Sequence, residues 1–259
     1  MHDLDLSAWL IGLGVLLAVV TITWVVSLVR GNASIVDSVW SLLFVAAAGT
    51  YAAVADAPGG ERRRLVLVLV TIWAVRLSAH ITWRNWGHGE DPRYQAMRRR
   101  QGPTFPRRSL VTVFLLQAGL AWVVSLPLLV GVDGSRPLGL LSGLGLAVWL
   151  TGVGFEAIGD LQLARFKADP ANAGAVMQRG LWRYTRHPNY FGDATQWWGL
   201  WLIAADAGGW WTAVGPALMT FLLLRVSGVA LLERRMARTR PAYADYVART
   251  NAFLPGRPR

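Results

Sequence analysis

The sequence predicts an all-α integral membrane protein with about seven transmembrane helices. Of its 259 residues, 54% are hydrophobic and 16% are charged, whereas an average soluble domain carries about 25% charged residues. Seven apolar stretches approach the length of about 20 residues that a helix needs to cross a bilayer core. The alternation typical of strands is absent, and a backbone in lipid must satisfy its hydrogen bonds internally, so each stretch is expected to be a helix.

The predicted spans follow one another without a Gly/Ser-rich linker or an internal repeat, so we expect a single membrane domain over residues 1–259. The first is a span rather than a signal peptide, because its flank MHDLDLS is acidic and its apolar run is longer than that of a signal. Several later turns contain Gly or Pro, which is typical of helix ends. The spans are expected at residues 7–29, 34–54, 65–83, 109–131, 138–159, 191–206 and 209–232.

The distribution of Lys and Arg predicts the orientation. If the N-terminus is outside, 20 of the 26 basic residues lie on the cytoplasmic side, in the connections and the tail. Cytoplasmic loops of membrane proteins carry such an excess, so the N-terminus is expected outside and the C-terminus inside. The long basic loops at about 84–108 and 160–190 then form a mouth on the cytoplasmic side of a bacterial inner membrane. The discordant basic residues are Arg62, Arg63, Arg64 and Arg136.

Composition excludes several classes of function. The formal net charge is +11, but Lys167 is the single lysine and the arginines flank apolar runs, so the expected partner is the lipid bilayer and not a nucleic acid. Without cysteine there is no disulfide, thiolate metal site or Cys nucleophile. The histidines lack the spacing H-E-x-x-H or H-x-x-E-H, and no metal site is expected. The sequence does not indicate an oligomeric state.

Ionisable residues inside the predicted spans are few, and such residues usually mark a function or an internal pair. Asp37 lies near one end of the second span, where it also suits the role of an ordinary first-turn acid. Arg76 and His80 lie four residues apart, on one face of the third span. His80 suits either a structural or a catalytic role. The later spans contain Glu156, Asp193 and Arg225.

The densest group of polar residues is the stretch GLWRYTRHPNYFGD at 180–193, directly before the sixth span. Pro188 marks a helix start, and arginines near helix N-terminal amides favour the binding of anionic phosphates. The alternative is a basic anchor for lipid headgroups. The rigid polar residues of this stretch, with Asp193 just inside the span, favour a binding site.

Several motifs together carry a family resemblance. RYTRHPNYFGD is followed by WWG at 197–199, LRVSGV at 224–229, YADY at 243–246 and FLP at 253–255. This combination resembles the C-terminal domain of the steroid 5-alpha-reductase family. More narrowly, the chain is similar to the bacterial DUF1295 branch, whose members also show RLSAHITWRNWGHGEDPRYQ, here at 76–95. The resemblance covers residues 34–256. Membrane isoprenylcysteine carboxyl methyltransferases and phospholipid methyltransferases share the His-Pro core of the motif.

The resemblance implies seven helices that enclose NADPH, held by the later helices and the cytosolic loops. Lys167 stands where the steroid enzymes carry arginine, and Glu233 where they carry tyrosine. The predicted cofactor-binding residues are Asp160, Arg165, Lys167, Arg183, Tyr184, Arg186, His187, Asn189, Tyr190, Asp193, Arg225 and Glu233.

The resemblance also implies catalytic residues. The catalytic acid of the family's second helix matches Asp37, and its third-helix tyrosine falls on His80, with Tyr94 as an alternative proton donor. The implied function is NADPH-dependent reduction of the C=C bond in an apolar α,β-unsaturated carbonyl compound, such as a steroid-like molecule or a lipid. A donor held against the carbonyl oxygen would stabilise the charge that develops there. The alternative is an S-adenosylmethionine-dependent membrane methyltransferase, and a non-enzymatic lipid-binding protein is a third possibility.

Overall fold

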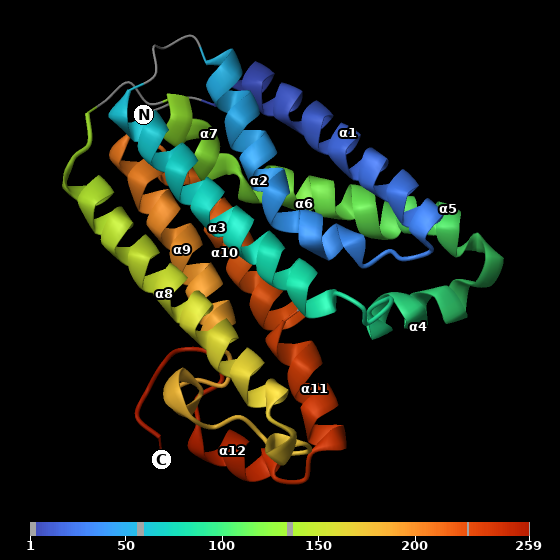
Figure 1. The fold of residues 1–259 in the computed structure, drawn as a ribbon. Helices are drawn as coiled ribbons and strands as arrows, with labels where there is room; N and C mark the ends of the chain where they lie inside the picture. The colour runs from blue at the N-terminus through green and yellow to red at the C-terminus, as the bar shows by residue number, and fades with distance from the viewer. Residues whose placement is uncertain (1–3, 56–59, 134–136, 227, 259) are drawn as a thin grey trace. The chain divides into compact units, whose positions relative to one another are not determined.

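The computed structural model describes residues 4–55, 60–133, 137–226 and 228–258, and no residue within these ranges lies in a strand. The chain divides into two compact units: residues 1–139 with 203–212, and residues 140–202 with 213–259. Figure 1 shows the helices of each unit. The helices are α1 Leu6–Arg30, α2 Ile35–Val54, α3 Glu61–Asn85, α4 Pro92–Gln101, α5 Phe105–Ser109, α6 Leu116–Val124, α7 Leu126–Asp133, α8 Leu140–Ala168, α9 Pro188–Asp206, α10 Val214–Phe221, α11 Val229–Thr239 and α12 Tyr243–Arg249.

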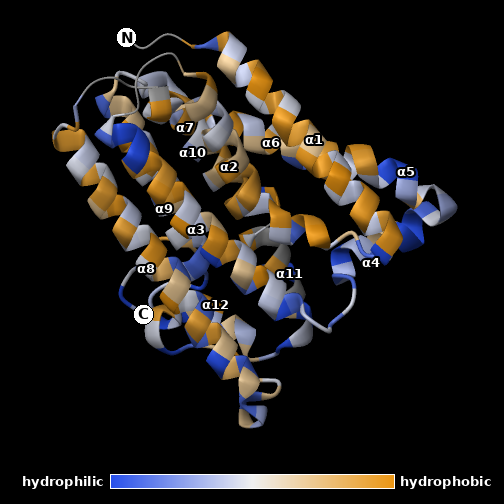
Figure 2. Cartoon of the chain, turned by 45° about the horizontal axis from the view of Figure 1, so that its top comes forward, coloured by the Kyte–Doolittle hydropathy of each residue, from blue (hydrophilic) through white to orange (hydrophobic). Residues whose placement is uncertain are grey.

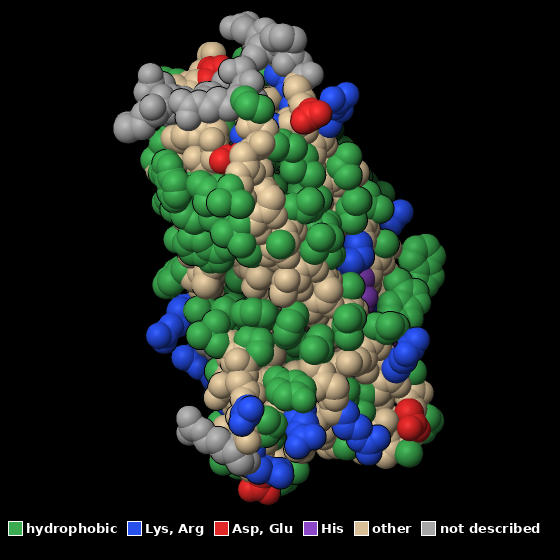
Figure 3. Space-filling view, turned by 90° about the vertical axis from the view of Figure 1, so that its left-hand side faces the viewer, with side chains coloured by type: hydrophobic (Ala, Val, Ile, Leu, Met, Phe, Trp, Pro, Cys, Tyr) green, Lys and Arg blue, Asp and Glu red, His purple; other side chains and the backbone are tan. Residues whose placement is uncertain are grey.

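The prediction of an all-helical membrane protein is confirmed in its coarse form. Among the described residues, five helical segments are long and apolar enough to cross a membrane: Leu6–Arg30, Ile35–Val54, Glu61–Asn85, Pro92–Val124 and Leu140–Ala168. Their surfaces are strongly apolar, as Figure 2 shows for α1 and α8, and hydrophobic side chains cover much of the face in Figure 3. Val29 is 85% exposed and Leu140 is 90% exposed. Such side chains suit contact with lipid rather than water.

The predicted fourth and seventh spans are interrupted. The fourth breaks at Ser125, between α6 and α7, where Pro127 lacks a backbone N–H and the hydroxyl of Ser125 donates to the carbonyl of Trp122 at 2.8 Å. Over the predicted seventh span, the apolar helical run is Trp210–Val226, and α11 begins at Val229. Its last five residues, Leu222–Val226, form a π-helix that contains Arg225.

In the first unit, α2 packs against α1 and α3 (Figure 1). Tyr51 of α2 is 1% exposed, and its hydroxyl is 2.8 Å from the Ser125 hydroxyl. A Cβ at Gly12 would lie 2.4 Å from the Tyr51 ring, so only glycine lets α1 approach α2 so closely. Trp9 stacks on Trp122 at 3.7 Å between ring centroids. These contacts fix α2, which carries Asp37, against α1 and the residues around Ser125.

Two arginines of the basic triplet at the start of α3 are bound within the first unit. Arg62 is 1% exposed and donates to the carbonyls of Ile203 at 2.5 Å and Pro137 at 2.7 Å. It also pairs with the Asp206 carboxylate at 3.1 Å. Arg63 donates to the Val132 carbonyl at 2.8 Å. Two of the discordant basic residues therefore hold helix ends within this unit instead of facing the solvent.

In the second unit, glycines allow α8 and α9 to pack closely. A Cβ at Gly192 would lie 2.5 Å from the backbone of Gly152, and one at Gly199 would lie 2.7 Å from the carbonyl oxygen of Gly145. Both pairs are spaced seven residues apart along their helices, so they lie on one face of each helix. Close approach through small residues is typical of helix packing in membranes. The α8–α9 interface carries several of the predicted cofactor-binding residues.

Candidate functional site

The first candidate site lies at the N-terminal end of α2, where a carboxylate meets a phenol and a guanidinium group. The Tyr94 hydroxyl donates to Asp37 Oδ1 at 2.7 Å, and Arg93 Nη2 donates to Asp37 Oδ2 at 2.6 Å. Tyr94 is 6% exposed, whereas the side chain of Arg93 is 41% exposed. Both carboxylate oxygens are thus held by donors from the first turn of α4.

Local sequence explains why α4 begins at this position. Asp91 is the N-cap and accepts a hydrogen bond from the backbone N–H of Arg93 at 2.8 Å, and Pro92 occupies the first helical position. The preceding Gly87 and Gly89 have φ values of 76° and 73°, which L side chains rarely adopt. The sequence Gly-His-Gly-Glu-Asp-Pro therefore turns the chain sharply and starts a helix with residues 93 and 94 in its first turn.

The turn before α4 is attached to the connection between α1 and α2. The backbone N–H of Asp91 donates to Ser34 Oγ at 2.6 Å, and Glu90 Oε1 accepts from the backbone N–H of Ala33 at 2.8 Å. Arg98 pairs with the same Glu90 carboxylate at 2.8 Å. Partial burial acts to raise the pKa of Glu90, but hydrogen bonds from Arg98 and Ala33 outweigh it and lower the pKa below its usual range. Glu90 is therefore an ionised anchor for this turn.

The catalytic residues expected from sequence are distributed over neighbouring elements. Asp37 and Tyr94 are hydrogen-bonded to each other across 57 positions of sequence. His80 lies in the C-terminal part of α3, with its ring centroid 6.1 Å from that of Trp83. The structure thus brings the alternative donor, Tyr94, directly to the predicted acid. A pairing of Asp37 with His80 stays a prediction.

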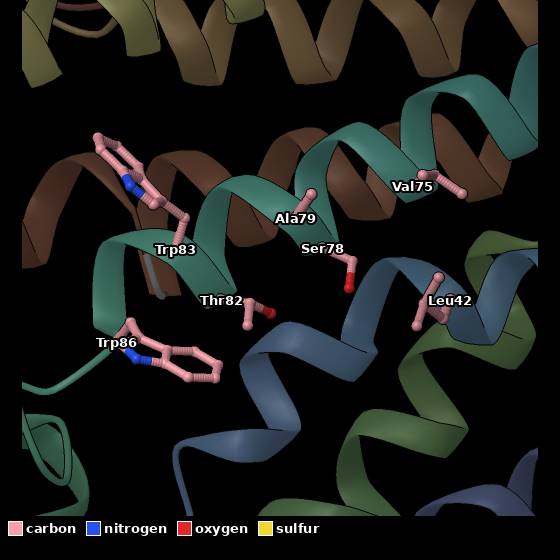
Figure 4. A pocket seen from close by; sticks show the side chains of 7 residues that line it. All are labelled: Leu42, Val75, Ser78, Ala79, Thr82, Trp83 and Trp86. Carbon is pink, nitrogen blue, oxygen red and sulfur yellow. The ribbon is translucent and has the colours of Figure 1, made fainter.

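A groove lies between α2 and α3 in the same unit. It has a volume of about 530 Å³ and is lined by Leu42, Val75, Ser78, Ala79, Thr82, Trp83 and Trp86. Figure 4 shows the hydroxyl groups of Ser78 and Thr82 among otherwise apolar lining residues. Trp86 caps the C-terminus of α3, at the end of the groove that leads into the turn before α4. A volume of this size suits a small apolar molecule.

In the second unit, the His-Pro motif is built into a network of ion pairs. Arg186 is 8% exposed and contacts the Glu233 carboxylate at 2.7 Å, and His187 Nε2 lies 3.2 Å from the same oxygen. Partial burial acts to raise the pKa of Glu233, but hydrogen bonds from His187 and Arg186 lower it below its usual 4.5. The ring of Tyr190 stacks on His187 at 5.6 Å between centroids. Arg186 and His187 are thus already engaged within the protein.

The C-terminal segment, residues 243–256, is attached to the same motif. Arg186 donates through its guanidinium group to the Thr250 carbonyl and through its backbone N–H to the Asn251 carbonyl. Further hydrogen bonds run from Thr185 to Phe253, from Gly256 to Tyr184 and from Tyr246 to Trp182. Burial and the charge of Glu233 raise the pKa of Tyr243 to about 12. The motifs YADY and FLP therefore hold the His-Pro motif in place.

Buried polar side chains line the α8–α9 interface. Asn189 donates to Asp160 at 3.1 Å. Gln196 Nε2 donates to the buried Glu156 carboxylate at 2.5 Å, which fixes the orientation of the amide. Among the described residues, Gln196 Oε1 is a buried atom without a hydrogen-bond partner. Buried polar atoms are rarely left unsatisfied, so this acceptor, one helical turn from the predicted Asp193, is an unusual polar feature of the interface.

Other predicted cofactor-binding residues are exposed. Arg165 and Lys167 lie in the last turn of α8, and Arg183 lies in the short 3-10 helix Gly180–Arg183, which contacts α8. Tyr184 is 45% exposed, and Arg225 is also exposed. The exposed arginines and the lysine form a donor set that fits the phosphates of a dinucleotide.

Sequence reasoning missed Arg93, Glu90 and the Glu156–Gln196 pair as site residues. Arg93 was counted only among the charges that set the orientation. The signal that could have revealed it is Asp-Pro-Arg-Tyr, because an Asp N-cap followed by Pro places the next two residues in a first helical turn. No comparable local signal marks Gln196.

The chain matches a known protein family. The family model described as a protein of unknown function, DUF1295, matches residues 23–250. This agrees with the family expected from the motifs; the matched region begins earlier than expected, at residue 23, and ends at residue 250, before the FLP motif. No curated protein and no solved structure matches the chain.

Proposed function

The chain belongs to the DUF1295 family, and from that premise we propose that it is an NADPH-dependent membrane oxidoreductase. Its substrate would be an apolar α,β-unsaturated carbonyl compound, steroid-like or lipid, whose C=C bond is reduced. The observation that carries the proposal is the 2.7 Å hydrogen bond between Tyr94 and Asp37, inside a membrane protein and close in sequence to an apolar groove. Reduction of a C=C bond conjugated to a carbonyl builds charge on the carbonyl oxygen. A phenol that is held in place by a carboxylate is suited to donate a hydrogen bond and a proton there.

Tyr94 is the proposed proton donor. NADPH, when bound, supplies a hydride to the β carbon, which builds negative charge on the carbonyl oxygen. The Tyr94 hydroxyl, turned from Asp37 toward that oxygen, would donate a hydrogen bond and then its proton. The resulting enol would tautomerise to the saturated carbonyl compound, and the Tyr94 phenolate would take a proton back from water. Asp37 holds the hydroxyl in place between turnovers. The hydrogen bond to Asp37 favours Tyr94 over His80, which remains the second candidate on α3.

The cofactor would be bound by the second unit. The exposed cations Arg165, Lys167 and Arg183 suit the pyrophosphate and the 2′-phosphate. Asn189 and Asp160, already paired at 3.1 Å, suit hydrogen bonds to the sugar or the amide. Tyr184, Tyr190, Asp193 and Arg225 complete the proposed contacts, whereas Arg186, His187 and Glu233 would hold the motif that presents them.

We further propose seven spans, with the N-terminus outside and the C-terminus inside a bacterial inner membrane. The distribution of Lys and Arg supports this orientation. Arg62 and Arg63 lie on the side predicted to be outside, but backbone carbonyls bind both of them, so they count less against it. Reporter fusions at Arg259 and in the 206–209 turn should fall on opposite sides of the membrane. A same-side result contradicts the topology.

The decisive experiment on the function is mass spectrometry of small molecules retained by the protein in mild detergent, followed by calorimetry. Retention of NADP(H), with NADPH binding and NADPH oxidation on addition of an apolar enone, is the expected result. Retention of S-adenosylmethionine with no affinity for NADPH would replace the proposal with the methyltransferase alternative.

A further inference from the structure

We propose that Arg93 is a positioning residue of the reaction proposed above, on which this inference rests. Its guanidinium group holds Asp37 so that the free carboxylate oxygen faces the Tyr94 hydroxyl. Arg93 Nη2 lies 2.6 Å from Asp37 Oδ2, and the Tyr94 hydroxyl lies 2.7 Å from Asp37 Oδ1. Each oxygen of one carboxylate is therefore assigned to a different donor.

The position of Arg93 is fixed by a second carboxylate. Arg93 Nε donates to Asp91 Oδ1 at 2.9 Å, and Nη2 lies 3.3 Å from Asp91 Oδ2. The guanidinium carbon also lies 5.4 Å from the centre of the Tyr94 ring. One planar group thus bridges two carboxylates and borders the phenol. A guanidinium group can do this because its donors form a rigid fork, which an ammonium group lacks.

The electrostatics of the site require a cation at this position. Without Arg93, the carboxylates of Asp37 and Asp91 would repel each other, and Asp37 Oδ2 would lose its donor in a poorly solvated site. The carboxylate would then be free to rotate or to take up a proton. Either change removes the fixed acceptor that orients the Tyr94 hydroxyl.

A purely structural role for Arg93 is disfavoured by the other contacts of the turn. The turn before α4 is held by Ser34, by the Ala33 backbone and by the ion pair of Arg98 with Glu90. None of these involves Arg93. Because the Arg93 side chain is 41% exposed, water can partly replace it as a partner of the two carboxylates, and its ion pairs are expected to contribute less to stability than a fully buried pair. Its removal should therefore affect turnover more than folding.

The test compares Arg93→Gln, Arg93→Lys and the control Arg99→Gln in the full-length protein. Arg99 is an exposed arginine of the same helix. With NADPH and an apolar enone, Arg93→Gln should lower kcat by about a hundredfold with little change in KM or melting temperature. Arg93→Lys should recover part of the loss, and Arg99→Gln should match the wild type. In Arg93→Ala, millimolar guanidinium should restore part of kcat.

Two results would overturn the inference in distinguishable ways. If the wild type turns over an enone and Arg93→Gln keeps its kcat, Arg93 has no positioning role although the proposed function stands. A loss in Arg93→Gln that tracks a lower melting temperature, with no recovery by lysine or guanidinium, would likewise assign Arg93 a structural role only. If the wild type neither binds NADPH nor oxidises it, the proposed function and this inference fail together.

Discussion

Replacement of Arg62 by glutamine should destabilise the protein strongly, although the residue belongs to a run of three arginines. Arg62 is 1% exposed and contacts the carbonyls of Ile203 and Pro137 and the Asp206 carboxylate. Glutamine is too short to reproduce this fork, so the carbonyls lose donors and the Asp206 carboxylate loses its ion pair with Arg62. Removal of one partner of a buried ion pair costs about 3 to 5 kcal/mol.

This cost can be measured as a change in melting temperature. For a chain of roughly this size, 1 kcal/mol corresponds to about 2 to 4 °C, so Arg62→Gln should melt about 6 to 20 °C below the wild type. Arg64→Gln is the matched control, because Arg64 is exposed on the same turn and the change in charge is identical. The assay is thermal unfolding in detergent, followed by tryptophan fluorescence.

A double variant separates the ion pair from the hydrogen bonds to carbonyls. Arg62→Gln combined with Asp206→Asn also removes the carboxylate charge that Arg62 neutralises, and an asparagine oxygen can still accept from the backbone N–H of Gly139, now 2.7 Å from the Asp206 carboxylate. The double variant should therefore melt above Arg62→Gln alone. Equal melting temperatures for Arg62→Gln and Arg64→Gln would refute the reasoning, because burial would then have no energetic consequence at this position.

Three further predictions concern the candidate sites. Tyr94→Phe should slow enone reduction by about a hundredfold or more, measured as NADPH oxidation; if only His80→Phe is inactive, the proton donor is His80. The lowered pKa of Glu233 stabilises the folded state above pH 4.5 and this contribution is lost as the pH falls through the folded-state pKa, so Glu233→Gln should flatten the acid limb of melting temperature against pH. Arg183→Gln should weaken NADPH binding about tenfold in calorimetry without a change in melting temperature, whereas Arg186→Ala should lower the melting temperature. If Arg186→Ala instead weakens NADPH binding and Arg183→Gln does not, Arg186 binds the phosphate.

The fold was predictable where composition determines it. The ends of α1 and α2 lie within about a residue of the predicted spans, because apolar length and the requirement for internal hydrogen bonds leave few alternatives in lipid. The break at Ser125 was visible in principle as Pro127 inside an apolar run. The roles of Arg62 and Arg63 were not predictable, because their acceptors lie up to 141 positions away in sequence.

The sites divide in the same way. The turn before α4 follows from the local order of Asp91, Pro92 and Arg93, but its attachment to Asp37 depends on a contact across 57 residues. Likewise, the motif that contains Arg186 was recognised as a binding stretch, yet the guanidinium group is occupied by Glu233 and the C-terminal segment. Local sequence indicated which segments carry the polar and charged residues of the candidate sites. The long-range contacts determined which of these charged side chains are paired within the protein.

The two kinds of arginine in this chain suggest how a membrane protein with so few acids uses many cations. Where an arginine is buried, as at Arg62 and Arg186, a carboxylate and backbone carbonyls bind its guanidinium group, so its charge supports the fold. Arg93 differs, because it is partly exposed, and two carboxylates share its guanidinium group. An arginine that contributes little to stability but holds a carboxylate beside a phenol is better explained by a role in the proposed reaction than by a role in folding. Arg93 is therefore the first residue to mutate.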